Sequence, residues 1–544
     1  MKKKLLALTL TAFMGFSVLA GCSGSQPAEG TDAAGDSAEP KIVRHNLGAD
    51  PQTIDPALNS AVDGAIFLVN VFEGLCKTDD KEKAVPGMAE SWEVSEDGLT
   101  YTFMLRDAKW SDGEPVTAND FEYAWKRALD PVTAAEYAYQ MYYLKGGEAF
   151  NSGEGSADEV GVKAIDEKTL EVTLESATPY FLELTAFPTY FPVRKDIVEA
   201  DPEGWALNMD TYISNGPFKA VEWSHNDVLR VVKNENYYNA DKVMLDGIDF
   251  YMIVEESTAM SAYESGEVDY IENIPTDQIP TLQESNEDFE IQPYLGTYFY
   301  VFNTSKEPVN DPKVRQALTL AIDRQAIVDV VTKAGQKPAS GFVPEGMTLS
   351  DGSSFRAAAG DFAIPPTANI EEAKKLLAEA GYPDGQGFPT IEVMYNTLEA
   401  HKAIAEAIQE MWKQNLGINV ELRNEEWKVF QETRTQGDFI IARHGWIGDY
   451  VDPMTFLDMW LSNSGNNNAQ WKNDDYDQAI ADSKKASGAD RDALMMKAEK
   501  IMMDDWITMP IYYYTKPTLL QPYVKNVHFS PLGFVFYENA DIQK

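Results

Sequence analysis

The chain has 544 residues, too many for a single ordinary domain core, so two or three domains are expected. Its formal charge of −42 at pH 7 argues against nucleic-acid binding, because phosphate contacts need clustered Lys and Arg. An apolar share of 44% and an aromatic share of 11% are typical of a globular protein and exclude a largely disordered one.

The first 21 residues have the pattern of a secretory signal. Three lysines at positions 2–4 precede an apolar run over 5–20, which is short for a membrane span. The run ends in Leu19-Ala20-Gly21-Cys22, which resembles the lipobox of bacterial lipoproteins. The resemblance implies cleavage before Cys22, lipid such as palmitate on its sulfur, and a protein anchored at the outer face of the bacterial cytoplasmic membrane. A plain secreted protein is the alternative.

Residues 22–40 are predicted to form a flexible linker. The segment after Cys22 is rich in Ser, Gly, Ala and Pro and holds four acids but no base. Folding is expected to begin near Lys41. Cys76 is then the only other cysteine, which excludes an intramolecular disulfide, and its apolar neighbours predict a buried small side chain rather than a catalytic thiol.

The first half of the body begins with a predicted strand and a helix ending near Phe72. Residues 101–105 alternate apolar and polar side chains, which predicts a half-buried strand. Thr117 is a plausible N-cap, with Asp120 three residues later. The helix 120–129 that follows places four apolar side chains on one face: Phe121, Ala124, Trp125 and Leu129.

The second half contains a predicted strand–helix–strand unit. Residues 390–395 and 418–422 alternate as strands, and 400–416 place apolar residues at helical spacing before Gly417. The two strands should be parallel with a right-handed crossover. An earlier helix, 370–380, has Asn369 as its predicted cap and Glu372 at the third position. These patterns predict an α/β domain.

Three loops are predicted to meet at the carboxyl ends of these strands, where ligands gather in open α/β sheets. Residues 439–442 indicate a buried strand, and residues 443–450 indicate the loop that leaves it. The loops bring together two guanidiniums, an imidazole, two indoles and a carboxylate: His401 after the first strand, Trp427 and Arg434 after the second, and Arg443, Trp446 and Asp449 after the third.

Such a rim has the chemistry to hold a free peptide. Asp449 can accept from the ammonium, while Arg or His can bind the carboxylate through charge-assisted hydrogen bonds. Gly445 and Gly448 would let the main chain approach the ligand, in the manner of an added strand. His444 is expected to point away from its neighbours. Tyr512 and Tyr514 alternate onto one face of an apolar strand.

Many separate motifs resemble the family-5 extracellular solute-binding proteins of ABC importers, over about residues 41–540. They occur in one order: Asp55-Pro56, Phe72–Leu75, Ala89–Arg127, Ser214–Phe218, Ser265–Asp269, Asp311–Leu318, Ala321–Arg324 and Phe342–Pro344. The resemblance implies a periplasmic-binding-protein-like type II (cluster C) α/β fold, with the ligand buried between two hinged lobes. Lobe I would comprise 41–72, 196–300 and 515–544, an extra domain II 73–195, and lobe III 301–514, with the hinge near 300 and 514.

The resemblance to the oligopeptide-binding type also implies roles for individual residues. In the motif Arg-x-Gly-Trp-x-x-Asp, Asp449 would pair with the peptide ammonium, and the main chain at Gly445 and Ile447 with the peptide backbone. Cations of different reach would take the peptide carboxylate: Arg434, Arg443 and His401. Further ligand contacts would come from Val62, Tyr137, Trp427, Trp446 and Tyr514. Ser60 departs from the family pattern, which has an acidic residue there.

No enzyme, cofactor or metal motif is found: there is no phosphate loop, no Gly-x-Ser-x-Gly elbow and no paired histidines. The sequence therefore predicts a monomeric, lipid-anchored receptor that captures oligopeptides without a cofactor and delivers them to a membrane ABC permease. The alternatives are a binder of dipeptides, nickel, heme or sugar, a hydrolase, and a signalling receptor for pheromone-like peptides.

Overall fold

The computed structural model describes residues 39–544. The predicted signal segment 1–21, the lipid-attachment residue Cys22 and all but the last two residues of the predicted linker 22–40 lie outside the described residues. Residues 40–544 form one compact unit. Within it Cys76 is buried, as predicted, and burial raises the pKa of its thiol to about 12.

The largest sheet has eleven strands. Apart from β13, which pairs with β17, they follow one order: β15 (Val420–Glu425), β14 (Ile391–Asn396), β16 (Ile441–Ile447), β12 (Phe289–Phe302), β17 (Thr508–Leu520), β11 (Tyr270–Ile271), β1 (Ile42–Asn46), β10 (Gly247–Tyr251), β9 (Val228–Lys233) and β8 (Phe218–Ser224). β13 spans Lys337–Pro338. Segments that are far apart in sequence are therefore neighbours in this sheet.

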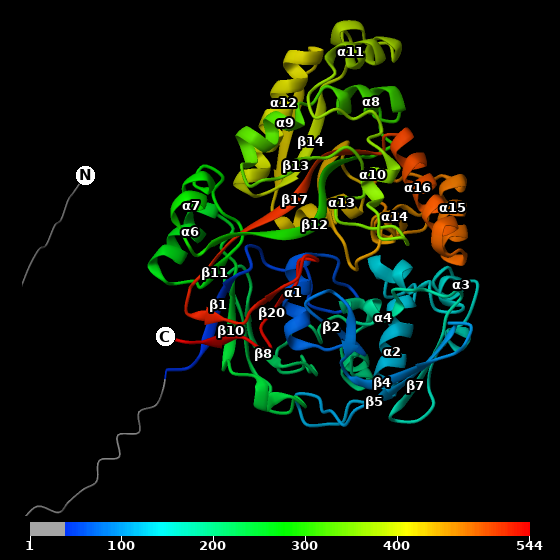
Figure 1. The fold of residues 1–544 in the computed structure, drawn as a ribbon, viewed down its shortest axis with the longest axis vertical. Helices are drawn as coiled ribbons and strands as arrows, with labels where there is room; N and C mark the ends of the chain where they lie inside the picture. Colours follow the sequence, from blue (N-terminus) through cyan, green and yellow to red (C-terminus); the bar gives the residue numbers. More distant parts are fainter. Residues whose placement is uncertain (1–38) are drawn as a thin grey trace, which may run out of the picture. The chain divides into compact units, whose positions relative to one another are not determined.

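Two long antiparallel strands, β12 and β17, join the two ends of this sheet. Figure 1 shows them running from the region of α8 (Pro312–Leu320) and α12 (Glu399–Leu416) toward β11 and β1. Their pairing is irregular in the middle, because Pro293 lies opposite Thr515 and Thr297 opposite Tyr513. This irregularity lies close to the positions where the sequence places a hinge. The hinge and the lobe boundaries stay predictions.

A separate four-stranded antiparallel sheet lies within residues 73–195. Its order is β4 (Ala89–Val94), β5 (Thr100–Leu105), β7 (Thr169–Thr173) and β6 (Val162–Ala164). Helix α2 (Ala118–Leu129) packs against β6 and β7 and begins as predicted, with the Thr117 N–H donating to the Asp120 carboxylate at 2.8 Å. Its four predicted core residues are buried.

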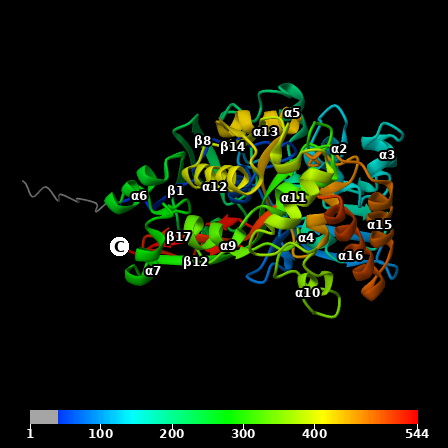
Figure 2. The same ribbon diagram turned by 90° about the horizontal axis from the view of Figure 1, so that it is seen from above.

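The predicted strand–helix–strand unit is confirmed. β14 and β15 are parallel neighbours, and α12 packs against both (Figure 2). Gly417 ends α12 with a φ of 71°, the left-handed conformation that glycine adopts without steric cost. Helix α11 (Ile370–Glu379) is capped by Asn369, whose side chain accepts from the Glu372 N–H, also as predicted.

The predicted loop at residues 443–450 is wrong in its first part. Residues Arg443 to Ile447 continue β16, whose partner β12 comes from about 150 residues earlier in the chain. His401 lies at the start of α12, within the predicted helix 400–416, while Trp427, predicted in a loop, begins α13 (Trp427–Thr435), which also holds Arg434. Residues 443–447 were predicted as a loop because glycine and charged residues have low intrinsic strand propensity. The long-range pairing with β12 outweighs that propensity and makes the segment a strand.

Four further helices of eight or more residues lie within residues 39–544. They are α1 (Val62–Val71), α6 (Glu256–Ser265), α15 (Asp474–Lys485) and α16 (Gly488–Asp504). Short helices of interest below are α10 (Phe355–Ala359), α14 (Met454–Leu457) and the 3-10 helix η1 (Glu136–Met141). Figures 1 and 2 both show α15 and α16 side by side.

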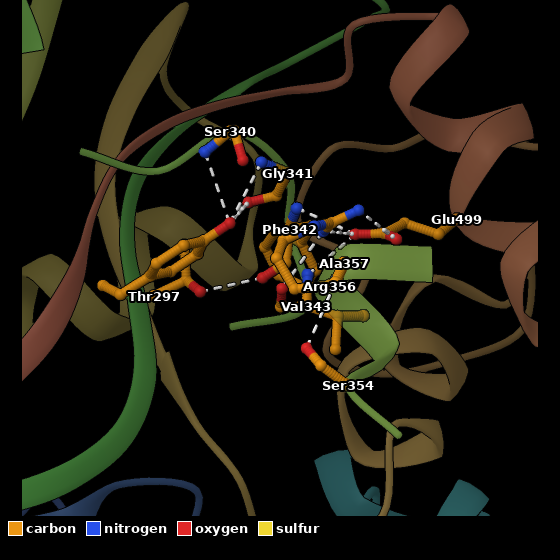
Figure 3. A network of polar contacts seen from close by, with 10 residues as sticks. Thr297, Ser340, Gly341, Phe342, Val343, Ser354, Arg356, Ala357 and Glu499 are labelled. Atoms are coloured by element: carbon orange, nitrogen blue, oxygen red, sulfur yellow. Dashed lines mark hydrogen bonds and ion pairs between the residues drawn. The ribbon is translucent and has the colours of Figure 1, made fainter. Parts of the chain in front are cut away.

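A buried ion pair joins α16 to the chain that follows β13. Glu499 is fully buried, and its Oε1 accepts from the main-chain N–H of Phe342 at 3.0 Å and of Val343 at 2.9 Å (Figure 3). Arg356 on α10 donates to both oxygens of this carboxylate, at 2.5 and 3.0 Å. The network holds Phe342 and Val343 in place, because both oxygens of a carboxylate that cannot reach water accept hydrogen bonds within it.

Replacing Glu499 by Ala should lower the free energy of unfolding by about 3–5 kcal/mol, because it leaves the Arg356 guanidinium buried and unpaired. Urea unfolding followed by tryptophan fluorescence measures the change. Glu379→Ala is the control, since Glu379 pairs with Lys313 in an exposed ion pair and should shift the midpoint little. Equal shifts for the two variants would contradict a structural role of the buried pair.

Candidate functional site

A cavity of about 500 Å³ lies at the junction of α1, α12, α13, β16 and β17. Its volume is within the ordinary range for small-ligand sites. The cavity is lined by all eleven residues that the sequence assigned to ligand binding, and Ser60 lines it as well: Val62, Tyr137, His401, Trp427, Arg434, Arg443, Gly445, Trp446, Ile447, Asp449 and Tyr514. The structure therefore brings the predicted site residues together in one place.

Asp449 places a buried carboxylate at this cavity without a cation. Its oxygens accept from the Tyr137 hydroxyl at 3.1 Å, the Gln140 amide at 2.6 Å and the Thr455 hydroxyl at 3.3 Å. No Lys, Arg or His among residues 39–544 pairs with it. Burial raises the pKa of this carboxyl well above its ordinary value, and the nearby Asp458 carboxylate raises it further. The site therefore favours a cationic group from a ligand.

Arg443 supplies a half-buried positive charge to the same cavity. Its guanidinium lies 4.9 Å from the centre of the Tyr298 ring and donates to the Tyr514 hydroxyl at 2.9 Å. Its Nε is buried and has no hydrogen-bond partner in the described part of the chain. No carboxylate of that part pairs with it. The guanidinium therefore retains donors for an anionic ligand group.

Arg434 and His401 are two further residues at the cavity that could bind an anionic ligand group. Arg434 is buried without an ion pair inside the described ranges, and its Nε also lacks a partner there. Burial lowers the pKa of its guanidinium to about 10, so it is charged at neutral pH. Burial and the Arg443 charge lower the pKa of His401 well below its ordinary value, so this imidazole is neutral. Its Nδ1 lies 3.3 Å from the Tyr298 hydroxyl.

One edge of β16 is free beside the cavity. The strand pairs with β12 along its whole length but with β14 only at Ile441 and Ala442. From Arg443 to Ile447, no strand of residues 39–544 pairs with the second edge. An extended main chain could therefore pair with this edge as an added strand.

Gly445 is required on this edge by packing. A Cβ atom on it would lie 2.3 Å from the Tyr514 hydroxyl, the group that holds Arg443. Its N–H donates to Nδ1 of His444 at 2.8 Å. The His444 ring is stacked on Phe299 and its Nε2 reaches Asn468, so the ring is held within the protein interior, although the residue borders the cavity.

Aromatic side chains close the cavity from different elements. The Trp446 ring lies parallel to Tyr137 with centroids 6.0 Å apart, which joins β16 to η1. The Trp427 indole donates to the Asp63 carboxylate at 3.0 Å, which joins α13 to α1. Burial raises the pKa of Asp63 to about 6. The cavity is thus enclosed by contacts between segments far apart in sequence.

The sequence did not indicate four further residues that line this cavity: Asp63, Glu256, Asn396 and Gln431. It also did not indicate Gln140, which donates to Asp449. Gln140 follows Tyr137 by three positions in η1, so the two share a face, and this spacing was a usable signal. The others come from elements whose approach to the cavity depends on tertiary structure.

The described residues contain no group of three His, Cys, Asp or Glu side chains arranged to hold a metal ion. Within the same residues, no helix combines the length and hydrophobicity that a membrane crossing needs.

The family model for bacterial extracellular solute-binding proteins, family 5 middle, matches residues 83–468. The oligopeptide-binding protein OppA of Bacillus subtilis is 39% identical over 550 residues, which cover 99% of each chain. The crystal structure of Haemophilus influenzae OppA in complex with RPPGFSPFR has a TM-score of 0.87 at 35% identity, covering 93% of this chain and 100% of that chain.

The conformation of the chain is closer to this peptide complex than to an open form. The unliganded open form of the murein tripeptide-binding protein MppA has a TM-score of only 0.61, at 34% identity and with coverage of 93% and 98%. Identity and coverage are almost equal in the two comparisons, so the lower score reflects a different arrangement of the same fold. These matches show that the chain belongs to the family-5 extracellular solute-binding proteins, a family of receptors with a multi-domain α/β periplasmic-binding-protein fold.

Proposed function

We propose that this protein is the extracytoplasmic peptide receptor of an ABC transporter, which captures oligopeptides in the cavity and delivers them to a membrane permease. One observation carries the proposal: among residues 39–544, a buried carboxylate with no ion-paired cation and two guanidiniums with no ion-paired anion flank a strand edge that no other strand pairs with. A free peptide offers the complement of each, namely an ammonium, a carboxylate and an extended main chain. None of these contacts depends on the side chains of the peptide.

The proposal assigns the peptide ammonium to Asp449 and its main chain to the β16 edge at Gly445 and Ile447. The carboxylate goes to Arg443, Arg434 or His401, depending on peptide length. The bound peptide leaves chemically unchanged, since the proposed role is transport. The names of relatives that bind oligopeptides support the ligand class.

Lobe I (41–72, 196–300 and 515–544) and lobe III (301–514), with domain II (73–195), would close around the peptide about the β12–β17 crossing. Closure is a population shift driven by contacts that exist only in the closed form. The contacts of Asp449 with Tyr137 and Gln140 support this proposal, since they join domain II to lobe III. The proposed receptor acts as a monomer, held at the outer face of the membrane by lipid on Cys22.

Asp449→Asn should weaken the binding of free peptides by about 30-fold or more, because truncating one partner of a buried charged pair costs about 2–5 kcal/mol. N-acetylation of the peptide should weaken its binding to the wild type similarly. Acetylation should cost the variant little more, since the pair is already lost. Isothermal titration calorimetry of the four combinations tests this. Full additivity of the two changes, or unchanged affinity for either, would contradict the assignment.

Peptide length should decide whether Arg443 or Arg434 pairs with the peptide carboxylate. With the ammonium fixed at Asp449, each added residue moves the carboxylate by about 3.3–3.6 Å. Arg443→Met and Arg434→Met should therefore weaken different members of an alanine peptide series of two to five residues. Amidation of each peptide should reproduce the loss in the wild type. If both variants weaken all lengths equally, length-dependent pairing is wrong. Unfolding midpoints serve as the control.

Cys22→Ser should release the protein from membranes, because it removes the attachment site of the proposed acyl chains. Membrane fractionation and immunoblotting measure the change. Cys76→Ala is the matched control, since Cys76 is buried and should leave the protein membrane-bound. Retention of the Cys22→Ser variant after a high-salt wash would count against the lipid anchor without affecting the peptide assignment.

A further inference from the structure

Acidic side chains gather at one end of the cavity. Glu255 and Glu256 lie at the start of α6, and both line the cavity. Glu399 lies at the start of α12, and Asp277 lies near the start of α7 (Ile279–Ser285). Glu255, Glu399 and Asp277 are exposed to solvent, and Glu399 and Asp277 each follow or precede residues that line the cavity, namely Leu398, Ala400 and Thr276.

Glu256 is the buried member of this group. It is only 2% exposed, yet it borders the cavity. Its Oε1 accepts from the main-chain N–H of Ala400 at 3.2 Å, and its Oε2 has no hydrogen-bond partner within residues 39–544. The carboxylate therefore supplies the cap that α12 lacks, since the N-cap residue Leu398 has no side chain able to accept.

No cation balances this charge in the part of the chain that the structure describes. None of the four acids forms an ion pair there, whereas the cavity residue Glu272 pairs with Lys516 at 2.7 Å. The largest charge effects on Glu256 come from Glu399, Glu255 and Asp277, and all three are negative. A buried carboxylate among like charges is costly unless a cation reaches it.

We propose that Glu256 selects peptides that carry a Lys or Arg side chain at the position facing this end of the cavity. The inference rests on the proposed function and adds to it a side-chain preference that the terminal and main-chain contacts do not provide. A cationic side chain would pair with the free Oε2, while Oε1 keeps its hydrogen bond to Ala400. In the proposed function His401 is one of the residues that bind the peptide carboxylate, and it directly follows Ala400. The selected side chain therefore belongs to the carboxyl-terminal part of the peptide, away from the ammonium at Asp449.

The purely structural alternative is that Glu256 only caps α12. Glu256→Gln separates the two roles, because the amide oxygen can still accept from Ala400 while the negative charge is lost. Glu410→Gln is the matched control: it removes one negative charge from α12, the helix that Glu256 caps, at an exposed position that does not border the cavity.

The test is a positional scan with peptides of equal length that carry Lys or its uncharged analogue norleucine at one position. In the wild type and in Glu410→Gln, calorimetry should give a preference for Lys of about 10- to 100-fold at one position, as expected for a charge-assisted hydrogen bond. In Glu256→Gln the two peptides should bind alike, with the affinity for norleucine unchanged.

The pH dependence is a second readout. Burial raises the pKa of the Glu256 carboxyl to about 7, and the negative charges of Glu399, Glu255 and Asp277 contribute. Below this pH a Lys side chain must displace a proton from Glu256, whereas above it the carboxylate is already ionised. The ratio of Lys to norleucine affinity should therefore fall between pH 8 and pH 6 in the wild type and stay flat in Glu256→Gln. The two peptides share the same termini, so the ratio reports on the side chain alone.

A preference for Lys that persists in Glu256→Gln, or a wild type that prefers Lys at no position, overturns the inference while leaving the peptide receptor intact. A wild type that binds none of the peptides overturns the proposed function instead. A fall in norleucine affinity equal to the fall in Lys affinity would mean that Glu256 acts only through α12, and it would also overturn the inference.

Discussion

The burial of charges without internal partners is the constraint on which this cavity depends. Asp449 and Arg434 are buried and Arg443 is half-buried, and none of the three forms an ion pair within residues 39–544. Neutral hydrogen bonds from Tyr137 and Gln140 offset part of the cost at Asp449 but do not neutralise its charge. The closed arrangement is therefore incomplete by itself, and a ligand with opposite charges at its two ends completes it. In the proposed receptor, this requirement would make lobe closure and ligand binding one coupled event.

The strands β12, β16 and β17 position the groups that such a ligand would contact. β16 is anchored along one edge by β12, and its other edge is open from Arg443 to Ile447. The Tyr514 hydroxyl from β17 occupies the space beside Gly445 and holds Arg443. The same three strands thus fix the cation and present the main chain. Their pairing irregularity near Pro293 and Thr515 lies next to the site, so a change in lobe angle there would act directly on the cavity.

The sequence predicted the elements whose signals are local. The parallel β14–α12–β15 unit, the caps of α2 and α11 and the left-handed Gly417 all follow from spacing and turn chemistry, and the structure confirms them. The loop predicted at residues 443–447 was wrong, because the strand there is set by pairing with Gly296–Phe302 rather than by its own propensities. Glu256 escaped prediction for a related reason: nothing near it in sequence indicates that α6 meets the start of α12.

Recognition through termini and main chain explains how a receptor can accept many peptides, yet it leaves no basis for preferring one. A preference requires a group that meets a peptide side chain, and such a group weakens the binding of every peptide that leaves it unpaired. Glu256 can favour a basic side chain and still tolerate peptides that lack one. It is buried enough to respond strongly to a cation, while its hydrogen bond to Ala400 and its raised pKa, about 7, let it remain in place as a neutral acid when no cation arrives. A bias for basic peptides can thus be added to a general receptor without excluding neutral ones.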